Sequence, residues 1–113
     1  MRWRAGRLAR TRDRGRSWDD LTDRLPSNAW RDRIVAGAAA GREILIGIDR
    51  GFPLQRSRLD EGLELWRSVD DGTTFARWDA GEMVSAFAPG PEGWYLGTVF
   101  RGLLRVPFAA KAP

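Results

Sequence analysis

The sequence predicts an all-β domain built from short antiparallel strands, and three observations support this fold class. First, the octet TRDRGRSW at residues 11–18 recurs in altered form as SVDDGTTF at residues 68–75, 57 residues later. Second, residues 34–51 are similar to residues 83–102, with an offset of about 50 residues. Third, short apolar or alternating runs are separated by Gly, Asp or charged loops, which is typical of strands and turns. The chain therefore contains internal repeats of short strands.

Four runs between residues 33 and 80 predict a four-stranded antiparallel meander. They are RIVAGAAA (33–40), EILIGID (43–49), LELWRSV (63–69) and TFARWDA (74–80). The first three strands recur at 83–89, 93–99 and 102–108, and the first 21 residues supply the last two strands of a preceding unit, which makes nine strands. The alanines of the first run would also suit a helix, but Pro89 and Pro91 in the second copy exclude one. Repeats of about 50 residues that form short strands are typical of a β-propeller or a solenoid.

Each octet is expected to form a tight turn between the third and fourth strands of its unit. The aspartate can accept hydrogen bonds from turn amides, the first hydroxyl can bond the same turn, and the glycine takes a positive φ without a Cβ penalty. The final aromatic residue is expected to begin the fourth strand and to pack between units. The residues given this structural role are Thr11, Asp13, Gly15, Ser17 and Trp18, and then Ser68, Asp70, Gly72, Thr74 and Phe75.

The octet resembles the Asp-box, S/T-x-D-x-G-x-S/T-W/F, also called the BNR repeat, and residues 11–18 match it at every defined position. The resemblance implies a β-propeller of the kind found in sialidases, sortilin-like receptors and photosynthetic assembly factors. Residues 1–113 then form one partial propeller domain with about two blades. Its parts are two strands with an Asp-box in 1–24, a complete blade in 31–79, and three strands of an incomplete blade in 83–108.

The incomplete blades predict association. A closed propeller needs about four to eight blades, so the chain is not expected to be a stable monomer. We expect either a fragment of a longer propeller or a ring of copies, in which the N-terminal fourth strand of one copy completes the last sheet of the next. That ring does not explain the extra strand before the first octet, which would either pair at the outer edge of the sheet or be displaced. An insertion at 52–62 also lengthens one connection by about a dozen residues relative to the second copy.

The composition excludes several classes of chemistry. The 113 residues include neither Cys nor His, which excludes disulfides, thiolate chemistry, Cys/His zinc sites and Ser-His-Asp triads. We therefore assign no metal, no cofactor and no catalytic residue. No apolar run is long enough to cross a bilayer and no export signal is visible, so a cytoplasmic location is the default expectation.

The net charge of +4 is concentrated at the N-terminus. Residues 1–18 contain seven Arg and one Asp, whereas the remaining 95 residues carry 12 basic and 14 acidic side chains. A basic stripe of this kind can bind phosphates. A solvated strand is the simpler explanation, because 18 of the 19 basic residues of the chain are Arg. Nucleic acid is therefore not the expected partner.

The resemblance also implies that ligands bind on the propeller face opposite the Asp-boxes. The loops expected on that face place arginines beside aromatic residues, which is the composition of an interaction hot spot. The candidate binding residues are Trp30, Arg33, Asp49, Arg50, Phe52, Arg56, Arg58 and Arg101. The alternative is a structural role, in which Arg50 and Arg101 pair with carboxylates of neighbouring blades.

These features predict a non-catalytic binding or assembly module that acts in protein–protein interaction, with copies of itself or other proteins as partners. The alternative is a glycan-binding or sialidase-like glycoside hydrolase propeller fragment. Such hydrolases use an arginine cluster to hold the substrate carboxylate, while a Tyr/Glu pair and an Asp perform the chemistry. Tyr95 is the one tyrosine of the chain, and packing in an apolar strand is sufficient to explain it.

Overall fold

The computed structural model describes residues 8–26, 34–49, 62–81 and 83–109, and the predicted all-β fold is confirmed. The strands are β1 (Ala9–Arg10), β2 (Asp19–Asp20), β3 (Ile34–Ala40), β4 (Glu43–Ile48), β5 (Glu64–Ser68), β6 (Ala76–Trp78), β7 (Val84–Pro89), β8 (Gly93–Thr98) and β9 (Leu103–Pro107). A 3-10 turn, Thr22–Arg24, follows β2, and these four segments contain no α-helix.

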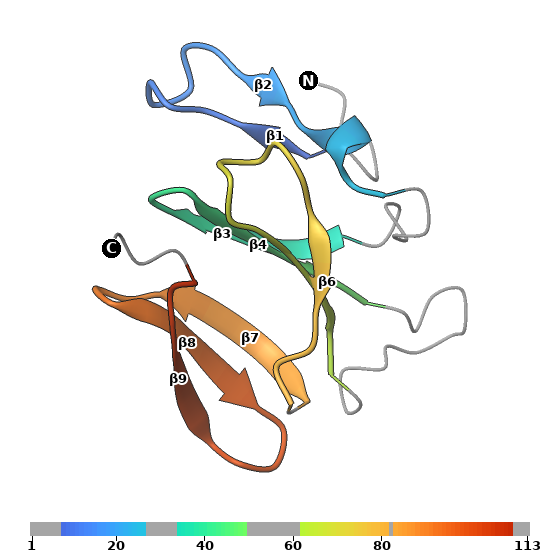
Figure 1. Ribbon diagram of the computed structural model, residues 1–113, viewed down its shortest axis with the longest axis vertical. Helices are drawn as coiled ribbons and strands as arrows, with labels where there is room; N and C mark the ends of the chain where they lie inside the picture. The colour runs from blue at the N-terminus through green and yellow to red at the C-terminus, as the bar shows by residue number, and fades with distance from the viewer. Residues whose placement is uncertain (1–7, 27–33, 50–61, 82, 110–113) are drawn as a thin grey trace.

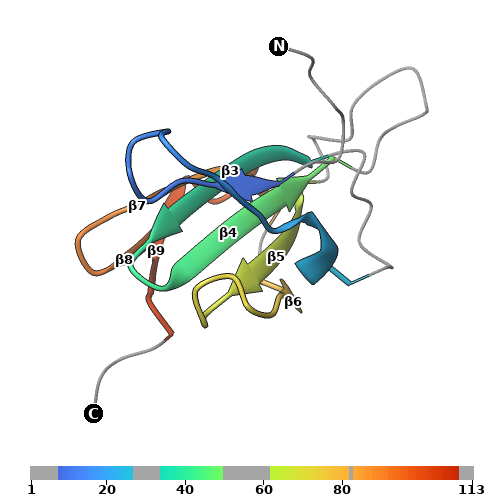
Figure 2. The same cartoon turned by 90° about the horizontal axis from the view of Figure 1, so that it is seen from above.

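The strands form three antiparallel sheets in chain order (Figure 1). The first sheet is β1–β2, the central sheet is β3–β6, and the third sheet is β7–β9, with each strand paired to its neighbours in sequence. The first and third sheets lie on opposite sides of the central sheet, and β1 and β3 overlap in Figure 2, which looks along the stack. The chain is thus a stack of three layers.

Strand β4 lies at the centre of the stack, because both of its faces are covered. All six of its residues are buried, as expected for a strand that has a layer on each side. Successive side chains of a strand point to opposite faces. Ile44, Ile46 and Ile48 accordingly belong to the core shared with the first sheet, whereas Leu45 belongs to the core shared with the third sheet, together with Trp94.

The repeats seen in the sequence have equal registers in the structure. Hairpins β1–β2 and β5–β6 share one register at the 57-residue offset, with Arg10 opposite Asp19 and Arg67 opposite Ala76. Hairpins β3–β4 and β7–β8 share one register at an offset of 50, including an irregularity near the start of β3 and of β7. Equivalent residues of the repeats therefore occupy equivalent places in their sheets.

The two interfaces between layers use equivalent faces. We name the side of each sheet that carries Ile44 and Ile46, or their equivalents Trp94 and Leu96, the back face, and the opposite side the front face. The back face of the third sheet packs on the front face of the central sheet. The front face of the first sheet, which carries Leu8, packs on the back face of the central sheet. The stack therefore has a direction: at each interface the front face of one sheet packs on the back face of the next.

Gly47, on the front face of β4, allows the central and third sheets to approach closely. A Cβ there would lie 2.9 Å from Leu63 Cδ1 and 3.1 Å from Phe87 Cε2. Gly47→Val is therefore expected to lower the free energy of unfolding by about 1–3 kcal/mol, because the two layers would have to separate.

The matched control is Gly97→Val, at the repeat-equivalent position on the front face of the third sheet. A Cβ at Gly97 meets nothing closer than 3.7 Å. Valine also suits a strand better than glycine, so the control is expected to keep or raise stability in dilute protein. Urea unfolding of both variants measures the difference, and equal destabilisation would contradict the close packing at Gly47.

Candidate functional site

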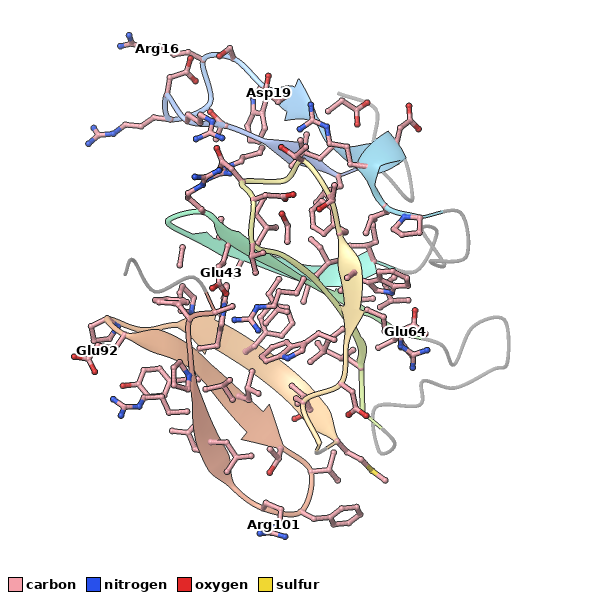
Figure 3. All side chains as sticks on the ribbon, viewed as in Figure 1. Arg16, Asp19, Glu43, Glu64, Glu92 and Arg101 are labelled. Atoms are coloured by element: carbon pink, nitrogen blue, oxygen red, sulfur yellow. The ribbon has the colours of Figure 1, made fainter. Side chains whose placement is uncertain are left out.

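Six of the eight candidate rim residues lie outside the described residues: Trp30, Arg33, Arg50, Phe52, Arg56 and Arg58. Asp49 follows β4 and is only 5% exposed, so it does not contribute to an open polar rim. Arg101 is exposed in the turn between β8 and β9, at the far end of the stack from Asp19 (Figure 3). Its backbone N–H donates to Thr98 Oγ1 at 2.8 Å. The described residues therefore do not bring a rim together.

The first octet closes a tight turn between β1 and β2 with its own side chains. Thr11 Oγ1 accepts the N–H of Gly15 at 2.7 Å and donates to Asp13 Oδ1 at 2.9 Å. The Asp13 carboxylate accepts both the backbone N–H of Ser17, at 2.8 Å, and its hydroxyl, at 2.6 Å. Arg14 and Gly15 have positive φ values of 61° and 90°. The polar side chains of this turn thus bond one another.

The second octet repeats this geometry between β5 and β6. Ser68 Oγ accepts the N–H of Gly72 at 2.8 Å and donates to Asp70 Oδ1 at 2.8 Å. Asp70 accepts the backbone N–H of Thr74 at 2.9 Å and its hydroxyl at 2.6 Å. Asp71 and Gly72 have φ values of 65° and 89°. The sequence assigned positive φ to the glycine, and the structure adds the residue before it.

The aromatic residues that end the two octets differ in burial. Phe75 is 6% exposed and belongs to the core between the first and central sheets. Trp18 is 60% exposed, and its indole N–H donates to the carbonyl of Gly15 at 3.1 Å. The expectation that both residues pack between layers is therefore wrong for Trp18. The physical reason is that, among the described residues, no layer covers the back face of the first sheet.

The octet aspartates are expected to make stability depend on acid pH. Hydrogen bonds from the hydroxyl and amide of Ser17 and of Thr74 lower the pKa of Asp13 and of Asp70, respectively, to about 2 from an ordinary value of 3.8. Because both folded values are depressed, this contribution is fully present above pH 3.8 and is lost as the pH falls through about 2.

Asp13→Asn and Asp70→Asn are therefore expected to lose stability at neutral pH and to flatten the decline of stability between pH 3.8 and about 2. Thermal unfolding over this pH range measures both effects. Asp79→Asn, in the exposed segment after β6, is the control. A decline as steep as that of the unmodified chain in both octet variants would contradict the role of these carboxylates.

Two arginines of the basic N-terminal stripe hold the first sheet to the central sheet. Arg10 and Arg12 both donate to the carboxylate of Asp71, in the turn of the second octet. The hydrogen bond from Arg12, supported by Arg10, keeps the pKa of Asp71 below its ordinary value. Arg24 also donates to the carbonyl of Gly72 at 3.2 Å. Sequence reasoning missed Asp71 because it occupies a variable position of the octet.

Glu43 joins the central sheet to the third sheet and was not identified from the sequence (Figure 3). It is 2% exposed, and its Oε1 accepts hydrogen bonds from Arg67 Nη2 at 2.7 Å and from Trp94 Nε1 at 2.9 Å. Its Oε2 accepts the N–H of Ala109. Burial raises the pKa of Glu43, but the hydrogen bonds from Trp94 and Arg67 outweigh burial, so the pKa lies below its ordinary value.

An apolar groove of about 280 Å³ lies between the first and central sheets. Trp18 and β1 line one side of it, and β3 and β4 line the other. The residues contributed by the central sheet are Gly37, Ala38, Ala39, Ile44 and Ile46. Within the described segments β1 pairs only with β2, whereas its equivalent β5 pairs on both sides. The groove therefore lies beside an unpaired strand edge.

Tyr95, on which the hydrolase alternative depends, lies on β8 opposite Ala88 and Arg105. Its ring packs beside Gly90, where a Cβ would come within 2.3 Å of Tyr95 Cε2. The side chain is half-buried on the front face of the third sheet. Packing against this turn accounts for its position.

In the described ranges, no group of three or more His, Cys, Asp or Glu side chains is arranged to hold a metal ion. No helix there has the length and apolar character to cross a membrane. Comparisons with family models, with curated proteins and with solved structures found no match.

Proposed function

We propose that this chain is a non-catalytic β-propeller module of the Asp-box type, which assembles with copies of itself and acts through protein–protein interaction. The two octets support the Asp-box assignment, because they form the same turn at the same place in two hairpins. The equal registers of the hairpins support the interpretation of the central sheet as a complete blade and of the other two as incomplete blades.

The direction of the stack is the observation that carries the proposal. Both internal interfaces place a front face on a back face. Among the described residues, the front face of the third sheet is uncovered, with Leu103 69% exposed, and the back face of the first sheet is uncovered, with Trp18 60% exposed. One end of the stack therefore has an open front face and the other an open back face, which is the combination that packs at both internal interfaces. Contact between unlike faces continues from copy to copy until it closes a ring.

Exposed apolar side chains at both ends agree with this proposal. A contiguous apolar face on a soluble protein commonly marks an interaction surface. On the third sheet, Leu103 and the half-buried Tyr95 lie on the same face as two alanines, Ala86 and Ala88, and the exposed Arg105 adds one charge to this face. Burying this face against a second copy would remove these side chains from water, which favours association.

The test is the mass of the folded chain, measured by size-exclusion chromatography with light scattering over an about hundredfold range of concentration. We expect a mass of at least twice 12.7 kDa at the highest concentration. Leu103→Arg is expected to lower the mass, because it puts a charge on the open front face. Val69→Arg places the same charge on an exposed side chain of the central layer and is the control. A single-chain mass at every concentration would overturn the proposal.

A further inference from the structure

Strands β1, β5 and β9 occupy the same position in their three sheets. All three carry the pattern Leu-x-Arg, at residues 8–10, 65–67 and 103–105. The arginine of β5 lies opposite Leu45 on β4, and the arginine of β9 lies opposite Tyr95, the repeat equivalent of Leu45, on β8. Strand β1 is equivalent to β5 through the common register of their hairpins. The chain thus contains three versions of one strand.

The three versions differ in their neighbours. In the described part of the chain, only β5 has a strand on each side, β4 and β6. Strand β1 has β2, but it has no neighbour equivalent to β4, and β9 has β8, but it has no neighbour equivalent to β6. Each of the two outer strands therefore lacks the neighbour that the other has. Unpaired strand edges are templates for pairing with another chain.

Strand β9 carries an arginine at the position equivalent to the arginine of β1, the strand that β2 now pairs with. Asp19 of β2 lies opposite Arg10 of β1, so in the same register it would lie opposite Arg105 of a second copy. The Arg105 side chain is 57% exposed, and its ion pair with Glu92 is a surface contact at 3.6 Å. Opposite charges that face each other across two strands favour this pairing. The charge pattern therefore allows β9 of a second copy to replace β1.

The apolar contacts match as well. Leu65 is 3% exposed in the completed central sheet, whereas Leu103, at the equivalent position, is 69% exposed. Placing β9 beside β2 would set Leu103 where Leu8 now packs against the core of the first and central sheets. The open side chain would then be covered in the same manner as its two equivalents.

The groove beside β1 lies where β7 and β8 of the second copy would pack. In the central sheet, the strands that precede β5 are β3 and β4, and in the third sheet those that precede β9 are β7 and β8. Strands β3 and β7 lie against each other across the existing interface. If β9 of a second copy replaces β1, its β7 and β8 fall on the groove over β3 and β4, which is lined by small and apolar side chains.

We propose that the chain assembles by strand exchange, in which β9 of a second copy replaces β1 beside β2, and β7 and β8 of that copy cover the groove from outside. This inference rests on the assembly of copies in the proposed function but changes the contact: the open front face of the third sheet packs on the back face of the central sheet of the next copy, in place of β1. It gives each copy one complete sheet of its own and one shared sheet, and it displaces β1, the strand for which the ring had no position. Displacing β1 gives up its two residue pairs with β2, the hydrogen bonds of the Leu8 backbone with Leu21 and Thr22, and the ion pair between Arg10 and Asp71.

Engineered disulfides test the exchange directly, because the chain contains no cysteine. Asp19→Cys with Arg105→Cys places one thiol on β2 and one on β9, at opposite ends of the stack within one chain, and directly opposite each other between exchanged copies. Asp19→Cys with Arg10→Cys is the matched control, since these residues are directly opposite within one chain. Both variants lose Asp19, so the loss of its charge cancels in the comparison.

After oxidation, the first variant is expected to form covalent dimers and higher multiples on a non-reducing gel. The second is expected to form a bond within the chain that locks β2 to β1, so that light scattering returns a single-chain mass, and reduction restores assembly. Far-UV circular dichroism of the oxidised second variant verifies that it keeps its strands.

The outcomes separate this inference from the proposed function. The exchange is wrong if the unmodified chain assembles but the first variant gives no covalent multiples. It is also wrong if the oxidised second variant keeps the assembled mass of the unmodified chain. In either case, association through other contacts stands. If the unmodified chain is a monomer at every concentration, both proposals fail. An assembly that includes only foreign protein, with no second copy, also overturns the exchange.

Discussion

Glu43→Ala is expected to lower the free energy of unfolding by about 3–5 kcal/mol, the usual cost of removing one member of a buried ion pair. The change leaves Arg67 with a side chain only 13% exposed and no carboxylate beside it. It also removes the acceptor for the indole N–H of Trp94 and for the N–H of Ala109. Because Glu43 belongs to the central sheet and Trp94 to the third, the interface between them should weaken most.

Urea unfolding, followed by far-UV circular dichroism, measures this loss. Glu92→Ala is the matched control, because Glu92 is 77% exposed and its ion pair with Arg105 is 3.6 Å long. Exposed pairs contribute about 0–1 kcal/mol, so the control should unfold close to the unmodified chain. Hydrogen exchange should also show β7–β9 losing protection before the central sheet in Glu43→Ala. A loss of stability no larger than that of the control would contradict the role of Glu43.

The strands and their order could be predicted from the sequence, because they depend on local signals. The alternation of side chains and the Gly and Asp turns mark each strand, and the two octets fix the hairpins between β1 and β2 and between β5 and β6. The repeat also excluded a helix at the alanine-rich β3, where local propensity alone favoured one. Consistency between the two copies was therefore more informative than composition.

The contacts between layers could not be predicted in the same way. Glu43 stands where the second copy has Gly93, and nothing in either segment shows that the carboxylate meets Trp94 across the interface. Trp18 and Phe75 have equivalent positions and opposite burial, because burial depends on whether another layer covers that face. A repeated sequence specifies equal local geometry, but the environment of each copy depends on its place in the stack.

The candidate site could not be predicted from the sequence either, because it depends on burial and on strand pairing. The loops expected to form a polar rim lie mostly outside the described residues, and Asp49 is buried where an exposed carboxylate was expected. The open edges of β1 and β9 became visible only from the pairing of strands. The Leu-x-Arg pattern was present in the sequence, but its meaning depends on the register that places its arginines at equivalent positions.

Trp94→Ala is expected to cost about 3–5 kcal/mol, the range for removing a large buried aromatic side chain. Trp94 is completely buried, and its ring makes edge contacts with Phe87 and Phe108 at centroid distances of 6.3 Å and 5.8 Å. Trp18→Ala makes the same chemical change at a side chain that is 60% exposed, and it is expected to alter stability by about 0.5 kcal/mol or less. Urea unfolding of both variants in dilute protein compares the two sites.

A double-mutant cycle decides whether Trp94 acts by packing alone or also through Glu43. Trp94→Phe keeps an aromatic ring but removes the N–H that donates to Glu43 Oε1 at 2.9 Å. If that hydrogen bond ties the third sheet to the central sheet, Trp94→Phe and Glu43→Ala, each of which removes it, should be non-additive, with a coupling of about 0.5–3 kcal/mol. Additivity within about 0.3 kcal/mol would mean that the aromatic contacts alone hold the interface and that Glu43 serves Arg67.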